Sequence, residues 1–318
     1  MATYKGIQGY TVQKLSDDPT ASEAEGQLFY NSSTGQFKIA VGGAGTWATG
    51  GALSTAGAYV GSTGIKAAAL CIGGAGTRAT DAVETYDGTS WSEGNDLLSG
   101  RGRSAAVGTT SAAITCGGEP PVTKKTESYD GTSWSEVNDL NTARYMGLAA
   151  GTQAAGLAFS GDPGNIADTE EWDGTSWTEV ANLNSGFGSG FGWGTVQNAA
   201  SAAKAAIHEE WDGTSWTTAT AMGTSRGVGA STGTQTSGLI FGGENPSGSA
   251  QLADTELWDG SAWTAGGNLA AVIYVQGGAG ASNSTALSFG GHPPAPGGTD
   301  ATEEWTNPIY SIKTVTVS

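Results

Sequence analysis

The sequence is poor in the residue types that carry metal sites, catalysis and nucleic-acid binding. Its 318 residues include two histidines and two cysteines, and 13 Lys and Arg stand against 30 Asp and Glu. The formal net charge of -17 argues against a nucleic-acid partner, which needs clustered cations. His208 and His292 are isolated, whereas a zinc site needs three or four convergent ligands. We therefore expect no metal, no cofactor and no catalytic residues, and we expect that the chain is not an enzyme.

Long apolar segments are also missing. No run of 18 apolar residues is present for a membrane span, and the polar start Met1–Gly6 opens no signal-peptide core. We expect no membrane insertion and no signal peptide. Cys71 and Cys116 each come just before Gly-Gly, about one repeat apart, which predicts two buried free thiols and no disulfide framework.

What the sequence does contain is a repeated motif: Glu, any residue, Tyr or Trp, Asp-Gly, two small polar residues and Trp. Full copies begin at Glu84, Glu127, Glu170, Glu209 and Glu256, and a sixth copy at Glu303 breaks off before its Trp. Each copy predicts a β-hairpin, because the Gly of Asp-Gly accepts a positive φ. The copies recur about every 40 to 50 residues, which is the length of a four-stranded propeller blade.

Each repeat divides into four predicted strands. The first is small and apolar (105–107, 148–150), the second ends before a glycine turn (112–116, 237–241), and the third and fourth form the hairpin. Only Gly and Ala leave room where strands converge, so the first strand is expected to lie next to the axis. Residues 184–206 depart from the pattern, and we interpret them as a degenerate copy of the same unit.

The count of tryptophans suggests how the chain closes. The fourth strands supply six tryptophans only if Trp47 is included with 91, 134, 177, 216 and 263, and the last unit has no Trp after Pro308. We therefore predict an all-β, six-bladed propeller, closed because the strand around Trp47 completes the last blade. In the alternative, Ile309–Val317 supplies that strand and a hairpin over 28–48 belongs to a seventh blade.

The N-terminal segment lies outside the repeat. Residues 1–27 are polar and predict an extended arm, and a hairpin with Gly35 in its turn follows over 28–31 and 37–41. The predicted domains are therefore 1–40, an arm and hairpin for attachment, and 41–318, the propeller.

The repeats resemble those of a known class of proteins. The Gly-Gly turn, the aromatic residue before Asp-Gly and the Trp beyond it resemble Kelch-type propeller repeats. Segments 140–145, 151–159 and 170–177, after an opening segment 26–35, look like repeats of marine bacteriophage proteins, over about residues 26–318. The resemblance implies a virion tail or fibre component.

Three kinds of charged residue recur in the repeats. The six motif glutamates are best explained as holding each blade in the same way, and the aspartates of the Asp-Gly turns as capping backbone N–H groups. Arg101, Arg144 and Arg226 follow Leu97, Leu140 and Met222 at the same distance. These arginines suggest either a site for an anionic sugar or carboxylate at one mouth of the propeller, or repeated surface residues over an aromatic rim.

Together these observations lead to two hypotheses. In the first, the protein is a phage virion component, attached to other virion proteins through its N-terminal arm. Four loops differ between repeats: 119–125, 162–165, 244–249 and 292–298. These loops would contact a host-surface glycan or protein. If the protein only decorates the particle, they would contact nothing. In the second, it is a sialidase-like carbohydrate-active enzyme. A mouth with an Arg and two or more carboxylates in a small-molecule pocket would favour the second.

Overall fold

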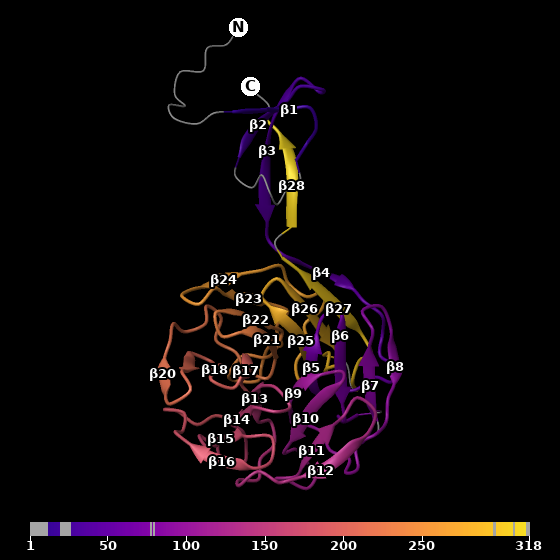
Figure 1. Cartoon of the computed structure of the whole chain (residues 1–318), viewed down its shortest axis with the longest axis vertical. Helices are drawn as coiled ribbons and strands as arrows, with labels where there is room; N and C mark the ends of the chain where they lie inside the picture. Colours follow the sequence, from indigo (N-terminus) through magenta and orange to yellow (C-terminus); the bar gives the residue numbers. More distant parts are fainter. Residues whose placement is uncertain are drawn as a thin grey trace. The chain divides into compact units, whose positions relative to one another are not determined.

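The computed structural model describes residues 12–19, 27–76, 78, 80–294, 297–307 and 309–315. Within these ranges every regular element is a β-strand, and the strands form seven four-stranded sheets (Figure 1). The described part thus contains no helix that could span a membrane. The chain divides into two compact units, Thr46–Thr306 and Met1–Gly45 with Asn307–Ser318, and each is described by itself.

The larger unit contains six of the seven sheets, and in five of them four consecutive strands pair antiparallel. The first three sheets are β5(Gly61–Ile65), β6(Ala68–Ile72), β7(Val83–Tyr86), β8(Trp91–Glu93); β9(Ala105–Thr109), β10(Ala112–Cys116), β11(Thr126–Tyr129), β12(Trp134–Val137); and β13(Leu148–Gly151), β14(Gly156–Phe159), β15(Thr169–Trp172), β16(Trp177–Val180). The next three are β17(Phe191–Val196), β18(Ala199–Lys204), β19(Ile207–Trp211), β20(Trp216–Thr218); β21(Ala230–Thr234), β22(Ser237–Phe241), β23(Thr255–Trp258), β24(Trp263–Ala265); and β25(Gly277–Ser282), β26(Thr285–Phe289), β27(Thr302–Thr306) with β4(Thr46–Thr49).

The first strand of each sheet lies innermost. These strands contact one another in the order β5, β9, β13, β17, β21 and β25, and β25 contacts β5. Small residues are required there: a Cβ on Gly192 would stand 2.6 Å from the Cβ of Leu148 in the neighbouring sheet. The degenerate unit 184–206 keeps this arrangement, because it supplies strands β17 and β18.

The sixth sheet takes its outer strand from the other end of the chain. Strand β4 pairs antiparallel with β27, and Trp47 lies opposite Trp305. Ile309–Thr314, the competing candidate for this position, is strand β28 and pairs with β3 instead.

The smaller unit is one sheet in the order β1(Gln13–Leu15), β2(Leu28–Asn31), β3(Gln36–Gly43) and β28(Ile309–Thr314). The predicted hairpin is present, with Gly35 at a φ of 67° between β2 and β3. Residues 13–15, which we expected in an unpacked arm, instead pair in parallel with β2. The rest of the expected arm, 1–11 and 20–26, lies outside the described residues. The C-terminal segment also joins this unit, although sequence analysis assigned it to the propeller.

Buried side chains fill the gaps between adjacent sheets. Cys71 and Cys116 are buried and free as expected, and desolvation raises the pKa of each thiol to about 12. Four of the outer-strand tryptophans bind the preceding sheet, because the indole Nε1 donates to the hydroxyl of a threonine at the start of its third strand, whereas Trp263 donates to the carbonyl oxygen of Thr220. The pairs are Trp91–Thr302 at 3.0 Å, Trp177–Thr126 at 3.2 Å, Trp216–Thr169 at 2.9 Å and Trp47–Thr255 at 2.9 Å.

The second sheet lacks one of these bonds. Val83 stands where four of the other sheets have threonine and one has His208, and the buried Nε1 of Trp134, in the same apolar cluster as Val83, has no partner. We expect Val83→Thr to raise the free energy of unfolding by about 1 kcal/mol, because it supplies the missing acceptor at nearly constant volume. Denaturant unfolding measures this, with Thr126→Val as the matched reverse change that should destabilise. An unchanged Val83→Thr would contradict the expectation.

Candidate functional site

The three arginines predicted to bind ligand are buried in the framework of the propeller. Arg101, Arg144 and Arg226 are 2%, 1% and 0% exposed. Each guanidinium faces a motif glutamate of its own sheet, in the pairs Arg101–Glu127 at 3.0 Å, Arg144–Glu170 at 2.6 Å and Arg226–Glu256 at 3.0 Å. None of the three lies among the described residues that line the axial cavity, so these groups act on the linkers between sheets.

The motif glutamates hold those linkers. The Glu170 carboxylate accepts the backbone N–H groups of Asn141 at 2.6 Å and Thr142 at 3.2 Å. In the first sheet the arginine that pairs with the motif glutamate comes from another position, because the linker has Gly57 where three other linkers have Arg101, Arg144 or Arg226. There Arg78, from the loop after β6, pairs with Glu84 and fills the space beside Gly57. Arg78 has no counterpart in the other repeats, so the repeat pattern does not predict its role.

The aspartates of the Asp-Gly turns cap the turn backbone. Asp130 Oδ1 accepts the N–H groups of Thr132 at 2.8 Å and Ser133 at 2.7 Å. These backbone bonds to Ser133 and Thr132 lower the pKa of the Asp130 carboxyl below its usual value. The same arrangement recurs at Asp87, Asp173, Asp212 and Asp259.

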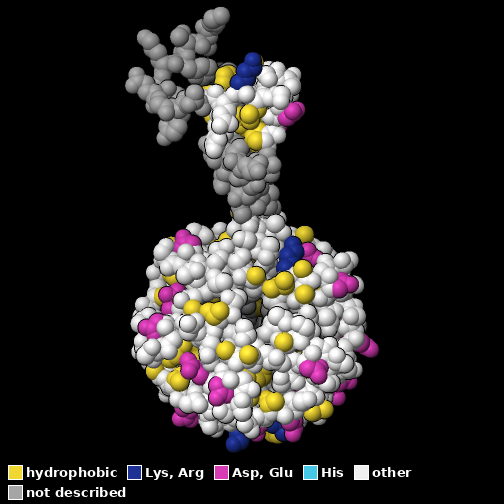
Figure 2. All heavy atoms as spheres, in the orientation of Figure 1, with side chains coloured by type: hydrophobic (Ala, Val, Ile, Leu, Met, Phe, Trp, Pro, Cys, Tyr) yellow, Lys and Arg dark blue, Asp and Glu magenta, His cyan; other side chains and the backbone are white. Residues whose placement is uncertain are grey.

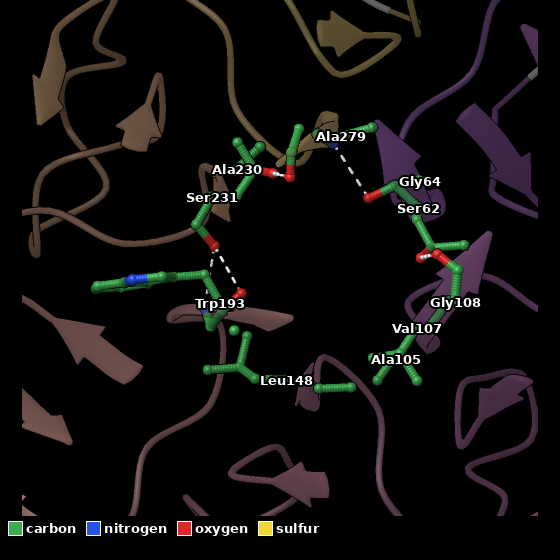
Figure 3. A pocket seen from close by; sticks show the side chains of 18 of the residues that line it. Ser62, Gly64, Ala105, Val107, Gly108, Leu148, Trp193, Ala230, Ser231 and Ala279 are labelled. Carbon is green, nitrogen blue, oxygen red and sulfur yellow. Dashed lines mark hydrogen bonds between the residues drawn. The ribbon is translucent and has the colours of Figure 1, made fainter. Parts of the chain in front are cut away.

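An axial cavity of about 520 Å³ runs along the innermost strands (Figure 3). Two serine hydroxyls of its wall form hydrogen bonds with a neighbouring sheet. Ser62 Oγ accepts the N–H of Gly278 at 3.1 Å, and Ser231 Oγ lies 3.0 Å from both the N and O of Gly192. Arg103 is the one charged residue among the described residues of the lining. In Figure 2 the propeller face shown is hollowed at its centre, with hydrophobic side chains around the hollow.

One end of this cavity is encircled by what we call the axial ring, six non-glycine residues that precede the innermost strands and have φ values between 50° and 60°. The ring comprises Tyr59, Arg103, Met146, Ser189, Val228 and Val275. Backbone bonds join successive members: Arg103 donates to Tyr59 at 2.7 Å, Met146 to Arg103 at 2.8 Å, Val228 to Ser189 at 2.8 Å, Val275 to Val228 at 2.6 Å and Tyr59 to Val275 at 2.9 Å. Left-handed backbone at non-glycine residues is uncommon, and the sequence gives no sign of it because the six side chains differ.

Aromatic side chains gather at the axial ring. The Arg103 guanidinium lies 3.9 Å from the centre of the Tyr59 ring and 5.9 Å from that of Tyr145, and it pairs with the Glu119 carboxylate. Across the same mouth the rings of Tyr274 and His292 are 5.2 Å apart. Desolvation, with smaller effects of Tyr59 and Glu244, raises the pKa of Tyr274.

The variable loops begin beside this mouth. Glu119, Asp162, Glu244 and His292, each at the start of such a loop, form backbone bridges to the residues that precede the axial ring. The rim thus carries an Arg and several carboxylates, whereas the described lining of the cavity itself contains no Asp or Glu. The condition set for a sialidase-like site, two carboxylates with an Arg inside one pocket, is therefore not met by the described lining of the cavity.

Comparisons with known proteins support the fold. No protein-family model matches the chain, and no curated protein sequence matches it. The solved structure described as "Structure of YjhT" is similar, with a TM-score of 0.68 and 11% sequence identity, over 82% of this chain and 99% of YjhT. At that identity the likeness shows the β-propeller fold alone.

The expectation that the chain is not an enzyme is not upheld. That expectation rested on missing catalytic motifs alone, and the likeness in fold to YjhT gives it no support. The comparison provides no support for a virion role.

Proposed function

We propose that the protein is a carbohydrate-active β-propeller that takes up the end of a glycan at the mouth of its axial cavity. The observation that carries the proposal is Arg103, which lies over Tyr59 and near Tyr145 at the entrance of a neutral-walled cavity of about 520 Å³. Aromatic faces pack against the C–H faces of sugars, and guanidinium and phenol groups bond their hydroxyls. The volume is within the range of about 300–1,000 Å³ for small-molecule sites.

The proposal includes a closed ring of six blades. Three observations support closure: the contact of β25 with β5, the pairing of β4 with β27, and the backbone bond from Tyr59 to Val275. A closed ring keeps the mouth residues in fixed positions, and a preformed site loses less conformational entropy on binding.

Proton transfer to a bound glycan would be a task for the rim. Glu119, Asp162 and Glu244 stand at equivalent loop starts, and the described cavity wall has no carboxylate. General acid–base catalysis needs such a group within hydrogen-bond reach of the reacting bond. The rim carboxylates are accordingly the candidates for catalysis, and the axial ring is the candidate for binding.

The test is a glycan array followed by titration of the retained glycans, with mass spectrometry of the products to detect cleavage. We expect Tyr59→Asn and Arg103→Gln each to weaken binding at least about tenfold, the loss of roughly one charge-assisted bond or aromatic contact. Asn is chosen because it tolerates left-handed backbone. Thr132→Ala, in an exposed Asp-Gly turn, is the control that should bind normally. If no glycan is retained, or if both mouth variants bind as the wild type does, the proposal fails.

A second candidate is a virion component. It is supported by the separate unit Met1–Gly45 with Asn307–Ser318, which has a sheet of its own. In this candidate function, residues 1–40 of that unit attach the protein to other virion proteins. Particle binding by the full chain but not by residues 46–306 is the expected result. Equal binding by both chains would rule out attachment through this unit.

A further inference from the structure

We propose that the axial ring selects an uncharged sugar with a methyl-bearing substituent, such as an acetamido or a 6-deoxy group. The inference rests on the proposed function and adds the class of ligand. It comes from how the six side chains are distributed around the ring. Tyr59 and Arg103 are adjacent and polar, whereas Val275 and Val228, on the other side of Tyr59, are apolar.

The two valines are the residues least suited to their backbone. Val228 has a φ of 60° and Val275 a φ of 52°, and a left-handed conformation is a genuine outlier for a β-branched residue. Gly would adopt it without strain, and Gly227 and Gly229 flank Val228. Strained residues of this kind cluster at ligand sites, which makes the two valine side chains candidates for a ligand contact.

Their position supplies that contact. Both valines line the axial cavity together with Met146, which also belongs to the ring. Val228 is half-buried and Val275 is 7% exposed, and neither valine belongs to the clusters of buried side chains that fill the gaps between sheets. A ligand whose hydroxyls face Arg103 and Tyr59 would thus present its opposite side to an apolar surface, where a methyl group gains by leaving water.

Charge argues against an acidic sugar. Arg103 is the one cation of the described lining, and Glu119 already pairs with it. Glu244 and Asp162 stand at the starts of two other rim loops. A carboxylate entering this mouth would meet like charges and no unpaired cation among the described lining residues, which disfavours it.

The experiment compares sugars that differ by the methyl-bearing group, using calorimetric titration of the full chain. N-acetylglucosamine and N-acetylgalactosamine test the acetamido group, D-fucose, the 6-deoxy form of D-galactose, tests the deoxy group, and D-glucose, D-galactose and D-glucuronic acid are the references. We expect a methyl-bearing sugar to bind at least about 4-fold more tightly than its reference. A 4-fold change corresponds to the roughly 0.8 kcal/mol of one buried methyl group at 1.4 kcal/mol per tenfold.

The variants separate a ligand contact from a folding role. Val228→Gly and Val275→Gly should each reduce the affinity for the methyl-bearing sugar to that for its reference sugar. The thermal midpoint of Val228→Gly should stay unchanged or rise because strain is relieved, whereas that of Val275→Gly also reflects the loss of a buried side chain. Ala205→Gly is the matched control: it relieves the same backbone conformation at a φ of 55°, lies outside the described lining of the cavity and should leave the preference intact.

The outcomes distinguish this inference from its premise. If no sugar binds, the proposed function fails and the ligand class fails with it. If sugars bind through Tyr59 and Arg103 without a preference for the methyl-bearing partner, only the inference on ligand class is overturned. A preference that survives in both valine variants, or the tightest binding for glucuronic acid, also overturns it.

Discussion

A chain that spans residues 50–306 is expected to lose cooperative unfolding of the propeller, whereas a chain of residues 46–306 should retain it. The two differ by strand β4 alone, which closes the sixth sheet through its pairing with β27. Trp47 lies 4.8 Å from Phe241 and 5.4 Å from Trp305 between ring centres, and its Nε1 bonds Thr255. Removal of one such aromatic side chain costs about 3–5 kcal/mol before the lost ladder is counted.

The shorter chain should also associate. Without β4, the edge of β27 presents unpaired N–H and C=O groups, and exposed strand edges recruit other chains. Thermal unfolding and light scattering of the two chains make the comparison. Residues 46–306 control for the loss of the smaller unit, since they contain every strand of the propeller. Equal midpoints and no association for residues 50–306 would show that β4 isn't needed to hold the sheets together.

Much of the propeller was predictable because the residues that recur in each repeat are those that form its turns and strands. The Asp-Gly turns, the glycine turns and the small first strands each report a local requirement, so sheets and strand order follow from the sequence. Trp47 was placed by counting, since one sheet lacked a Trp and one Trp lacked a sheet, and it pairs with the strand of Trp305. The C-terminal strand β28 was open to two readings, because alternation shows that a strand forms but not which edge it joins.

The functional site was less predictable because a repeat hides what differs between copies. Arg101, Arg144 and Arg226 were noticed because they recur, and a recurring residue serves what all sheets share, here the linker glutamates. Tyr59 and Arg103 do not recur, and what unites the ring is a backbone conformation that leaves no sequence signature. The signal that would have indicated the mouth residues is a position that keeps its place in every repeat while its side chain changes.

The buried ion pairs provide the second prediction. We expect Arg144→Met to lower the free energy of unfolding by about 3–5 kcal/mol, because it leaves the buried Glu170 carboxylate without its counter-charge. The same guanidinium donates to the carbonyl oxygens of Ser160 at 3.0 Å and Asp168 at 2.9 Å, which would also lose their donor. For a domain of this size the midpoint should fall by roughly 10 °C.

The matched control is Arg103→Met, whose pair with Glu119 is partly exposed and is expected to contribute less than about 1 kcal/mol. Below its unfolding transition, Arg144→Met should still bind the glycan, because Arg144 lies outside the described cavity lining, whereas Arg103→Met should not. A double variant Arg144→Met, Glu170→Gln should recover part of the stability, since the uncompensated charge is then removed. If Arg144→Met were as stable as Arg103→Met but had lost the glycan, the arginine would be a ligand contact, as its recurrence in the sequence first suggested.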